Sequence, residues 1–424
     1  MRKERTSQLV NEKRTIAKIL FVTFHNLSNV RDGGGAYEKQ AFECLSKLTD
    51  AELLQIKDDK AKSGLARVCD NNYSVFIPWI SDRVTRKIVN CAIDHEADFV
   101  VFMSAMFGKA ICALFKRHIA SVCFSVNCEY DYYRAESSNI FKRFVKSNIA
   151  RIDESQAFRY AQIMVSLNQR DAMRSEELYH RKAEYIVPTN CKDNFVKRDT
   201  TQKIDGISDT VTDGTSEQKS KREAIKSTVY ASERVSKAHL LFVGNNFGPN
   251  YQGILWFVKN VLPYISADLW IVGKNFENRR NEFATISKKV KVIGTVPSTD
   301  PYYQDAAAIV SPIFSGAGMK FKTAEALMQG KYIFGTTEAF MGYDVDFNQV
   351  GGLCDDAKAF IEKINRFLTS KLDEAKSSNT DIFFNSYARQ VFLEKYSAQA
   401  VMKQYQEIVS KMYEYTRQEK AGGF

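Results

Sequence analysis

Proline and glycine are scarce in this sequence, with 7 and 21 residues, and no long hydrophobic run is present. The low share of these two residues argues against a low-complexity protein or a chain dominated by linkers. The longest apolar stretches, 19–24 and 99–107, are far shorter than the roughly 18–20 residues that cross a bilayer, so we expect no transmembrane helix. Residues 1–14 are charged and lack the apolar core of a signal peptide, which predicts a cytoplasmic protein.

Clustered metal ligands are lacking as well. The 5 histidines lie far apart, and the 8 cysteines form no CxxC pair and have mostly apolar neighbours. Without an HExxH, HxH or CxxC spacing, the sequence predicts no metal site and no metal cofactor. In a cytoplasmic chain such cysteines are expected to be buried free thiols rather than disulfides.

What remains is an ordinary globular composition. The chain has 424 residues, of which 44% are hydrophobic and 26% charged. This length suffices for about two or three domains, and the composition excludes wholesale disorder, collagen and a coiled coil. The net charge of +10 is compatible with an anionic membrane or a nucleic acid. Because no RNP-like motif, zinc finger or helix-turn-helix accompanies the charge, we expect no nucleic-acid partner.

Short apolar runs alternate with amphipathic segments along most of the chain. Runs of strand length between helical patterns predict an α/β fold with parallel sheets covered on both faces. The expected helices include 36–48, 253–264, 320–329 and one or two within 382–414. The expected strands are 18–24, 98–103, 120–124, 162–167, 184–187, 240–243, 269–272, 291–293, 307–310 and 332–334.

Residues 199–237 interrupt this alternation, because they are rich in Thr, Ser, Lys, Asp and Glu and contain almost no large apolar residue. Such a segment cannot bury enough surface to order itself and predicts a linker or an exposed insertion. Two α/β domains joined in this way predict a ligand in the cleft between them. The expected division is a tail 1–14, an N-terminal domain 15–196, a linker 197–238, a C-terminal domain 239–395 and a last helical segment 396–424.

The most informative stretch is 309–335, with the sequence IVSPIFSGAGMKFKTAEALMQGKYIFG. A strand leads into a glycine-rich turn, 315–318, and a helix is expected to begin near Met319 and to end at Gly330. Glycines just before a helix let backbone N–H groups approach an anion, and the helix dipole favours negative charge there. This pattern favours a phosphate site.

The charged residues of the same helix fit that interpretation. Lys320 and Lys322 add the formal positive charge that a diphosphate requires, and the carboxylate of Glu325 suits the two hydroxyls of a ribose. The alternative is a simple βα unit whose lysine and glutamate are exposed to solvent.

The stretch resembles the nucleotide-binding signature of retaining, family-4-type glycosyltransferases of the GT-B fold, the glycosyl transferases group 1. Their second domain carries a glycine-rich turn, a lysine and a helix with an EA…G segment, which is 325–330 here. Further matching pieces follow in the order that such domains show, at 242–244, 250, 256–257, 271–274 and 292–296. The resemblance implies two Rossmann-like domains with parallel sheets facing across a cleft, and a last helix that crosses back to the N-terminal domain.

The resemblance also implies a function, the transfer of a hexosyl-type sugar from a nucleotide diphosphate sugar to a saccharide, glycolipid or glycoprotein. The enzyme would be retaining and metal-independent, and would serve the synthesis of a bacterial surface polysaccharide or glycoconjugate. Its N-terminal domain would bind the acceptor. Lys320 is the expected catalytic residue on the diphosphate, 294–296 would hold the base through backbone groups, and Glu325 would hold the ribose. The expected donor-binding residues are Gly34, Gly35, Gly244, Lys274, Gly294, Thr295, Val296, Gly316, Gly318, Met319, Lys322 and Glu325.

Two positions depart from the family pattern. The first of the family's two glutamates falls on Ala317, and the histidine of an HN-x-E-x-x-Y segment falls on Val126. Both family residues contact the donor. Their replacement leaves open an alternative, a non-catalytic glycosyltransferase-like partner that stabilises or positions another transferase. A nucleotide-sugar epimerase would need carboxylates and a histidine poised in the cleft, and the sequence offers no such set.

The N-terminal half offers further matches. Gly33–Gly35 are expected in a loop that either presents backbone donors to the cleft or is a simple connection. Asn127 and Glu129 match the HN-x-E-x-x-Y segment, and Asn168 and Arg170 match an LN-x-RD segment, which places all four on the acceptor side or in the cleft. The alternatives are that Asn168 caps the next helix and that Arg170 belongs to an ordinary surface ion pair.

Three other sequence features have ordinary structural explanations or alternatives. The DxD at 344–346 is expected to be a chance occurrence rather than a metal site, and His25 is expected to be a polar loop residue. Residues 139–151 carry four basic residues and no acidic one, interleaved with large apolar side chains. Such a stretch either lies on an anionic membrane, which would make the protein peripheral at the cytoplasmic face, or packs its apolar stripe on its own domain.

Overall fold

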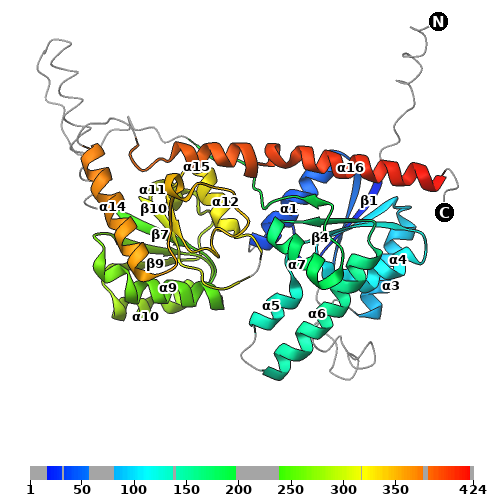
Figure 1. Ribbon diagram of the computed structural model, residues 1–424, viewed down its shortest axis with the longest axis horizontal. Coiled ribbons are helices and arrows are strands. Elements are labelled where there is room, and N and C mark those ends of the chain that lie inside the picture. The colour runs from blue at the N-terminus through cyan, green and yellow to red at the C-terminus, as the bar shows by residue number, and fades with distance from the viewer. Residues whose placement is uncertain are drawn as a thin grey trace, which may run out of the picture. The chain divides into compact units, whose positions relative to one another are not determined.

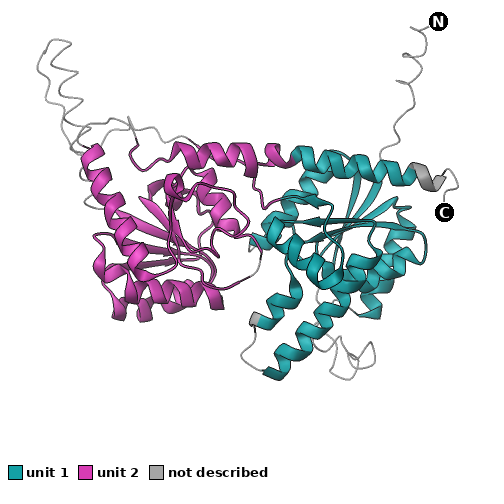
Figure 2. Cartoon of the chain, viewed as in Figure 1, with its two compact units in different colours: residues 1–187, 402–424 teal, residues 188–401 magenta. Residues whose placement is uncertain are grey.

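The computed structural model describes residues 17–30, 33–56, 81–136, 140–196, 238–316, 318–375 and 381–420. The chain divides into two compact units, which Figure 2 distinguishes by colour. Unit 1 consists of residues 1–187 and 402–424, and unit 2 consists of residues 188–401. The expected tail 1–14 and the linker residues 197–237 lie outside the described residues.

The unit boundary differs from the division expected from the sequence. Residues 188–196 belong to unit 2, although they were assigned to the N-terminal domain. Helix α16 (Ala398–Lys420) begins in unit 2 and continues in unit 1 from residue 402. In unit 1 the ring of Tyr405 lies 6.3 Å from that of Phe124, and the hydroxyl of Tyr413 accepts a hydrogen bond from the backbone N–H of Ala17.

Unit 1 contains a parallel sheet of six strands in the order β2-β1-β3-β4-β5-β6 (Figure 1). Strands β3, β4 and β5 are buried at every position, as an α/β sheet with helices on both faces requires. The edge strand β2 was not expected, because its sequence DAELLQ mixes charged and apolar residues and stays partly exposed. The strands are β1 Lys18–Thr23, β2 Asp50–Gln55, β3 Phe99–Phe102, β4 Ala120–Ser125, β5 Ile163–Ser166 and β6 Tyr185–Ile186.

Unit 2 repeats the design with a six-stranded parallel sheet in the order β12-β11-β10-β7-β8-β9. The five strands expected in this half are confirmed, and β12, a three-residue edge strand of sequence GGL, was missed. The strands are β7 His239–Val243, β8 Asp268–Val272, β9 Val290–Gly294, β10 Ala308–Ser311, β11 Ile333–Gly335 and β12 Gly351–Leu353. The expected fold class, α/β with two parallel sheets, is therefore confirmed.

Helices connect the strands in both units. The helices of unit 1 are α1 Gly33–Ser46, α3 Asp82–Asp94, the 3₁₀ turn η2 Ala105–Phe107, α4 Gly108–Phe115, α5 Glu129–Glu136, α6 Ile140–Tyr160 and α7 Gln169–Tyr179. The helices of unit 2 are α9 Gly248–Asn260, η3 Leu262–Tyr264, η4 Phe276–Arg279, α10 Arg280–Ile286, α11 Asp300–Asp305, α12 Phe321–Met328, α13 Phe347–Val350, α14 Ala357–Ala375, α15 Ser386–Val391 and the π-helical turn η5 Phe392–Tyr396.

The three consecutive glycines do not form the expected loop. Helix α1 begins at Gly33, so all three lie in its first turn, and the loop prediction was wrong. Buried Tyr37, Ala41 and Leu45 recur at four-residue intervals and attach the helix to the core, which offsets the low helix propensity of glycine.

Two adjacent buried carboxylates of α6 hold the amino ends of α4 and α5. Asp153 accepts a hydrogen bond from the backbone N–H of Lys109 at 3.0 Å, and Glu154 accepts from Glu129 at 2.8 Å and Tyr130 at 3.0 Å. Burial raises the pKa of Asp153 to about 8 and that of Glu154 to about 7. Since carboxylates stabilise helix amino ends, α6 fixes the position of both shorter helices.

Two further expectations concern cysteines and membranes. The cysteines that the structure describes are free thiols, and most of them are buried, as predicted. Among the described helices, none combines the length and the apolar character that crossing a membrane requires.

Candidate functional site in unit 2

The strand order of the sheet in unit 2 reverses between β7 and β10, which makes the carboxyl ends of these two strands the topological switch point of the sheet. From the central strand β7 the chain builds β8 and β9 on one side and β10, β11 and β12 on the other. In open parallel sheets a crevice forms outside the carboxyl ends of the strands at such a point and holds the ligand. Two loops begin there, 244–247 after β7 and 312–320 after β10. Of the expected donor-site residues, Gly244 lies on the first loop, and Gly316, Gly318 and Met319 lie on the second.

The loop after β10 makes a glycine-dependent turn into α12. Gly316 has a φ of +150° and Gly318 a φ of +64°, conformations that favour glycine. Lys320 is the N-cap residue of α12, and its side chain makes no capping hydrogen bond. The amino end of α12 therefore presents helical N–H groups and positive dipole potential at this edge of the sheet. Ala317 lies outside the described residues.

The ammonium of Lys322, in the first turn of α12, lies near β7, the loop that follows it and the start of α9. Its Nζ donates a hydrogen bond to Oδ1 of Asn250 at 2.7 Å and lies 4.7 Å from the ring centre of Phe242. A Cβ added to Gly244 would lie 2.8 Å from the same Nζ. These three neighbours carry no charge. Burial, with a smaller contribution from the charge of Lys320, lowers the pKa of Lys322 to about 7.

Lys320, the expected catalytic residue, has different surroundings. Its Nζ donates to Oε1 of Glu338 at 2.7 Å and to the carbonyl of Gly318 at 2.8 Å. Only 13% of the Lys320 side chain and 16% of the Glu338 side chain are exposed. The charge of Lys320 is thus balanced by a carboxylate of the fold itself.

Glu338 was not among the expected site residues, although its place shortly after an expected strand is a local signal. Glu338 follows β11, which pairs with β10, and the carboxyl ends of adjacent parallel strands meet at the same edge. The pairing order of the strands was the information that the sequence alone did not provide.

Glu325 lies in the second turn of α12 and is partly buried. Its Oε2 accepts a hydrogen bond from the hydroxyl of fully buried Tyr303 at 3.2 Å. Burial raises the pKa of Glu325 to about 7, against the opposing effects of the Tyr303 hydrogen bond and the Lys322 charge. Neither Lys322 nor Glu325 is exposed, so the alternative of a βα unit with a solvent-exposed lysine and glutamate does not describe them.

Glycines bring the ends of β7, β8 and β9 close together. Gly273 has a φ of +146°, and a Cβ there would lie 1.9 Å from the carbonyl oxygen of Gly244. The N–H of Gly273 donates to the carbonyl of Gly294 at 2.8 Å, and Asn246 donates to the carbonyl of Lys274 at 2.9 Å. The expected donor residues Gly244, Lys274 and Gly294 therefore lie on one connected backbone edge.

One expected base-binding group is already engaged. The N–H of Thr295 donates to Oε2 of Glu277 at 3.1 Å, and its hydroxyl lies 3.0 Å from Oε1 of the same carboxylate. Hydrogen bonds lower the pKa of Glu277, so the carboxylate form is favoured. Glu277 was not among the expected site residues. Val296, the next residue, is partly exposed.

The two residues of the LN-x-RD segment in unit 1 have the structural roles that were the alternatives to a site role, a helix cap for Asn168 and an ion pair for Arg170. Asn168 is the N-cap residue of α7 and exchanges hydrogen bonds with Asp171, accepting from its N–H at 2.9 Å and donating to its carboxylate at 2.8 Å. Arg170 lies 3.3 Å from the carboxylate of Asp171 and is 43% exposed. The buried side chain of Asn168 is thus occupied by capping.

The other expected residues of unit 1 lie at or near the ends of strands. Asn127 follows β4, and its carbonyl accepts a hydrogen bond from the hydroxyl of Ser125 at 3.2 Å. Glu129 begins α5, where Glu154 holds its N–H. At the end of β1, His25 Nδ1 lies 3.0 Å from the buried carboxylate of Glu38 on α1, a pairing that the sequence did not predict.

The DxD aspartates have structural partners. The carboxylate of Asp344 pairs with Nζ of Lys395 at 2.6 Å, and Asp346 caps α13 by accepting from the N–H of Asn348 at 2.9 Å. Among the residues that the structure describes, no group of three or more His, Cys, Asp or Glu side chains could hold a metal ion.

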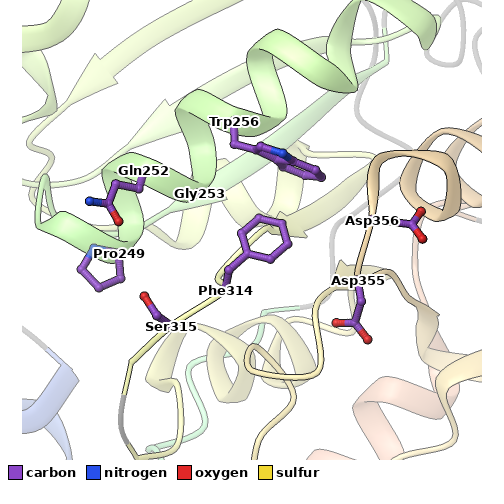
Figure 3. Close-up of a pocket in the computed structure, with 8 residues that line it drawn as sticks. All are labelled: Pro249, Gln252, Gly253, Trp256, Phe314, Ser315, Asp355 and Asp356. Carbon is purple, nitrogen blue, oxygen red and sulfur yellow. The ribbon is translucent and has the colours of Figure 1, made fainter. Parts of the chain in front are cut away.

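A cavity of about 400 Å³ opens near the start of the glycine-rich turn (Figure 3). Figure 3 shows the rings of Trp256 on α9 and Phe314 near each other, with Asp355 and Asp356 on one side. Ser315, at its other side, is the first residue of the turn. None of the expected site residues lines this cavity, whose walls are Pro249, Gln252, Gly253, Trp256, Phe314, Ser315, Asp355 and Asp356.

Comparisons with known proteins agree with this geometry. Residues 237–370, which include β7, the glycine-rich turn and α12, match the family model described as Glycosyl transferases group 1. Sucrose-phosphate synthase from Thermosynechococcus elongatus matches 94% of this chain and 100% of its own, with a TM-score of 0.69 and 12% identity. The chain has the GT-B fold.

Other GT-B structures show the same likeness. HepE from Anabaena, solved in complex with UDP and glucose, matches 93% of this chain and 100% of its own, with a TM-score of 0.57 and 13% identity. A glycosyltransferase from Rickettsia africae matches 94% of this chain and 99% of its own, with a TM-score of 0.60 and 14% identity. No match was found among curated proteins. The resemblance to GT-B glycosyl transferases group 1 is confirmed, while the retaining family-4 subgroup stays a prediction.

Proposed function

We propose that this protein is a glycosyltransferase that moves a sugar from a nucleotide diphosphate sugar to a hydroxyl of a saccharide or glycolipid acceptor. The observation that carries the proposal is the partly buried ammonium of Lys322 at the switch point of unit 2, beside the amino end of α12. A diphosphate is the ligand that suits a cation, helical N–H groups and close-approaching glycines together. The family match over residues 237–370 supports the choice.

Lys322 is the main diphosphate contact in this proposal. Its neighbours Asn250, Phe242 and Gly244 are uncharged, so a diphosphate would supply a counter-charge that these described neighbours do not provide. During transfer the leaving diphosphate gains negative charge, which a fixed ammonium stabilises in the transition state.

Lys320 is the second diphosphate contact. Its ammonium can contact a phosphate only by exchanging or sharing the Glu338 carboxylate that lies 2.7 Å away. Because one anion replaces another, the net gain is smaller than at Lys322. The same turn lets the backbone come close to the phosphates and offers its N–H groups as donors, at Gly316, Gly318 and Met319.

The nucleoside is proposed to lie along the ends of β8 and β9. The Glu325 carboxylate would accept both ribose hydroxyls, in exchange for or in addition to its bond from Tyr303. The base would contact the backbone of Gly294 and Val296, since Glu277 already occupies the N–H of Thr295. Catalysis in this scheme uses ammonium groups and helix N–H groups instead of a metal, and we propose retention of the anomeric configuration from the family resemblance alone.

The acceptor is proposed to bind through unit 1, with Glu129, Asn127 and exposed Arg170 as candidates for its hydroxyl groups. We further propose that the enzyme acts at the cytoplasmic membrane face in the synthesis of a bacterial surface polysaccharide or glycoconjugate. Exposed apolar residues at the start of α6 support a membrane setting.

Thermal unfolding with candidate donors tests the proposal. UDP, GDP and ADP and their sugar conjugates are added singly, and a ligand at a hundred times its dissociation constant should stabilise the fold by about 2.7 kcal/mol. Release of nucleotide diphosphate in the presence of an acceptor then measures transfer. Stabilisation without transfer to any acceptor would favour the non-catalytic partner, and no stabilisation by any nucleotide would overturn the proposed function.

A further inference from the structure

The start of α6 exposes three large apolar side chains. Ile140 is 72%, Phe141 68% and Phe144 67% exposed. In contrast, Ile149, five residues after Phe144, is buried in a small core cluster with Tyr133. The sequence left open that the whole stripe packs on its own domain. The structure contradicts that alternative for the first turn and a half of the helix.

The three side chains form one patch rather than scattered contacts. At about 100° per residue, Phe144 lies about 40° around the helix from Ile140 and about 60° from Phe141, so it falls between them and one turn further along. Large exposed apolar patches on a folded chain mark an interaction site. Figure 1 shows α5 and the start of α6 standing out from the sheet of unit 1.

The charged residues of the first three turns of α6 are all basic. Lys142 is exposed and Arg143 partly exposed in the same turns, Arg151 is exposed further along, and no acidic residue occurs from 140 to 151. Arg134 on α5 is also exposed. The patch therefore combines apolar side chains with basic flanks, which is the composition of helices that lie on anionic bilayers.

Three carboxylates of α5 and α6 are held within the fold. Asp131 forms two hydrogen bonds with Arg174, at 2.7 and 3.1 Å, and Asp153 and Glu154 cap α4 and α5. These caps also fix α6 against its neighbours, so the patch is presented by a supported helix. These three carboxylates are thus directed inward or paired with a cation.

We propose that the patch formed by Ile140, Phe141 and Phe144, with Lys142 and Arg143, docks unit 1 on the surface of an anionic lipid bilayer. The apolar side chains enter the boundary between headgroups and acyl chains, and the basic ones contact anionic headgroups. We favour an anionic bilayer over a protein partner because a bilayer binds both the apolar and the basic side chains and does not need a complementary groove. This inference deepens the membrane setting proposed above, since a surface-bound enzyme meets a lipid-linked acceptor in two dimensions.

Vesicle cosedimentation of the full chain without donor or acceptor tests the docking separately from transfer. We expect wild-type protein to pellet with vesicles of phosphatidylcholine and phosphatidylglycerol and only weakly with phosphatidylcholine alone, and added salt to weaken the binding. Phe141→Ser with Phe144→Ser should lower the partition coefficient by about tenfold or more. Lys142→Glu with Arg143→Glu should lower it by at least about twenty-five-fold, because each of the two basic residues lost contributes about fivefold and the two new carboxylates add repulsion.

Matched controls carry the same changes elsewhere. Lys358→Glu with Lys403→Glu changes the net charge equally at side chains that are 83% and 82% exposed, and Tyr264→Ser with Leu393→Ser removes exposed apolar groups of unit 2. Both controls should bind vesicles like wild type. Equal losses in patch and control variants would overturn the docking, as would wild-type protein that does not pellet with anionic vesicles. Self-association that Phe141→Ser with Phe144→Ser abolishes, without vesicle binding, would assign the patch to a second copy of the chain.

Discussion

The protonation state of Lys322 should make kcat/KM for the donor depend on pH, and one substitution should shift that dependence. Its pKa is lowered to about 7, mainly by burial, so the unliganded enzyme loses this ammonium as the pH rises above neutrality. Since kcat/KM reports on groups of the free enzyme, kcat/KM for the donor should fall about tenfold per pH unit above pH 7. Glu325, whose pKa is raised to about 7, should produce the acid limb, because its carboxylate form is the one that accepts ribose hydroxyls.

Substitution of Lys322 by arginine separates the two limbs. A guanidinium stays charged beyond pH 12, so Lys322→Arg should move the alkaline fall upward by about two pH units or more, even if its larger head lowers the maximum. Lys322→Ala should cost about 3–4 kcal/mol of transition-state stabilisation, on the order of a hundred- to a thousand-fold in kcat/KM. Glu325→Gln should flatten the acid limb and leave the alkaline limb in place.

The assay measures initial rates of nucleoside diphosphate release from pH 5.5 to pH 10 at low donor concentration, in buffers of constant ionic strength. Trp256→Phe in the neighbouring cavity serves as the control and should retain the wild-type profile. An alkaline limb that Lys322→Arg does not shift would refute the assignment of that limb to Lys322. A Lys322→Ala variant with wild-type kcat/KM would remove the residue from the donor site.

Three further expectations follow from particular contacts. Glu338→Gln should lower the donor KM severalfold, because it frees the ammonium of Lys320 from a competing carboxylate. It should also cost about 1–3 kcal/mol of stability in chemical denaturation. An unchanged or higher KM would contradict the proposal that the diphosphate exchanges with Glu338 at Lys320. Gly253→Ala places a Cβ 1.8 Å from a carbonyl of the loop after β10, so it should lower Tm and donor affinity together, whereas an unchanged Tm would show that the packing tolerates the methyl group. The pKa values of Asp153 and Glu154 are raised, so the folded state holds their protons more tightly than the unfolded state. The free energy of unfolding should therefore fall as the pH rises from about 4 to about 8, by up to about 1.4 kcal/mol per pH unit for each group. Asp153→Asn should flatten part of this slope in urea titrations at several pH values, and a slope identical to that of wild type would exclude Asp153 as its source.

Buried strands could be predicted from the sequence because they are continuous apolar runs. The runs at 99–102 and 308–311 are buried on both faces, so nearly every side chain reports its position. The edge strands 50–55 and 351–353 escaped because one side of an edge strand meets solvent, which mixes polar residues or glycine into a short segment. The loop expected at Gly33 failed for another reason, since packing of the following residues overrode the low helix propensity of glycine.

The candidate site could be predicted only in part. The glycine turn and Glu325 are local in sequence, so their spacing indicates a phosphate-binding turn followed by a helix. The different roles of Lys320 and Lys322 depend on partners 18 and 72 residues away, Glu338 and Asn250, which no local pattern reveals. Likewise, the carboxylate that occupies the N–H of Thr295 belongs to Glu277 in the 3₁₀ turn η4, and only the fold shows that the two groups meet.

Calorimetric titration with UDP and with uridine, on wild type and Lys322→Ala, tests the diphosphate site most directly, with GDP and ADP and their nucleosides run in parallel. The diphosphate should make wild-type binding tighter than nucleoside binding by about a hundredfold or more, and Lys322→Ala should remove most of that difference while nucleoside binding stays unchanged. If the advantage of the diphosphate over the nucleoside is the same in both proteins, the switch point of unit 2 does not hold the diphosphate through Lys322, and the central claim fails.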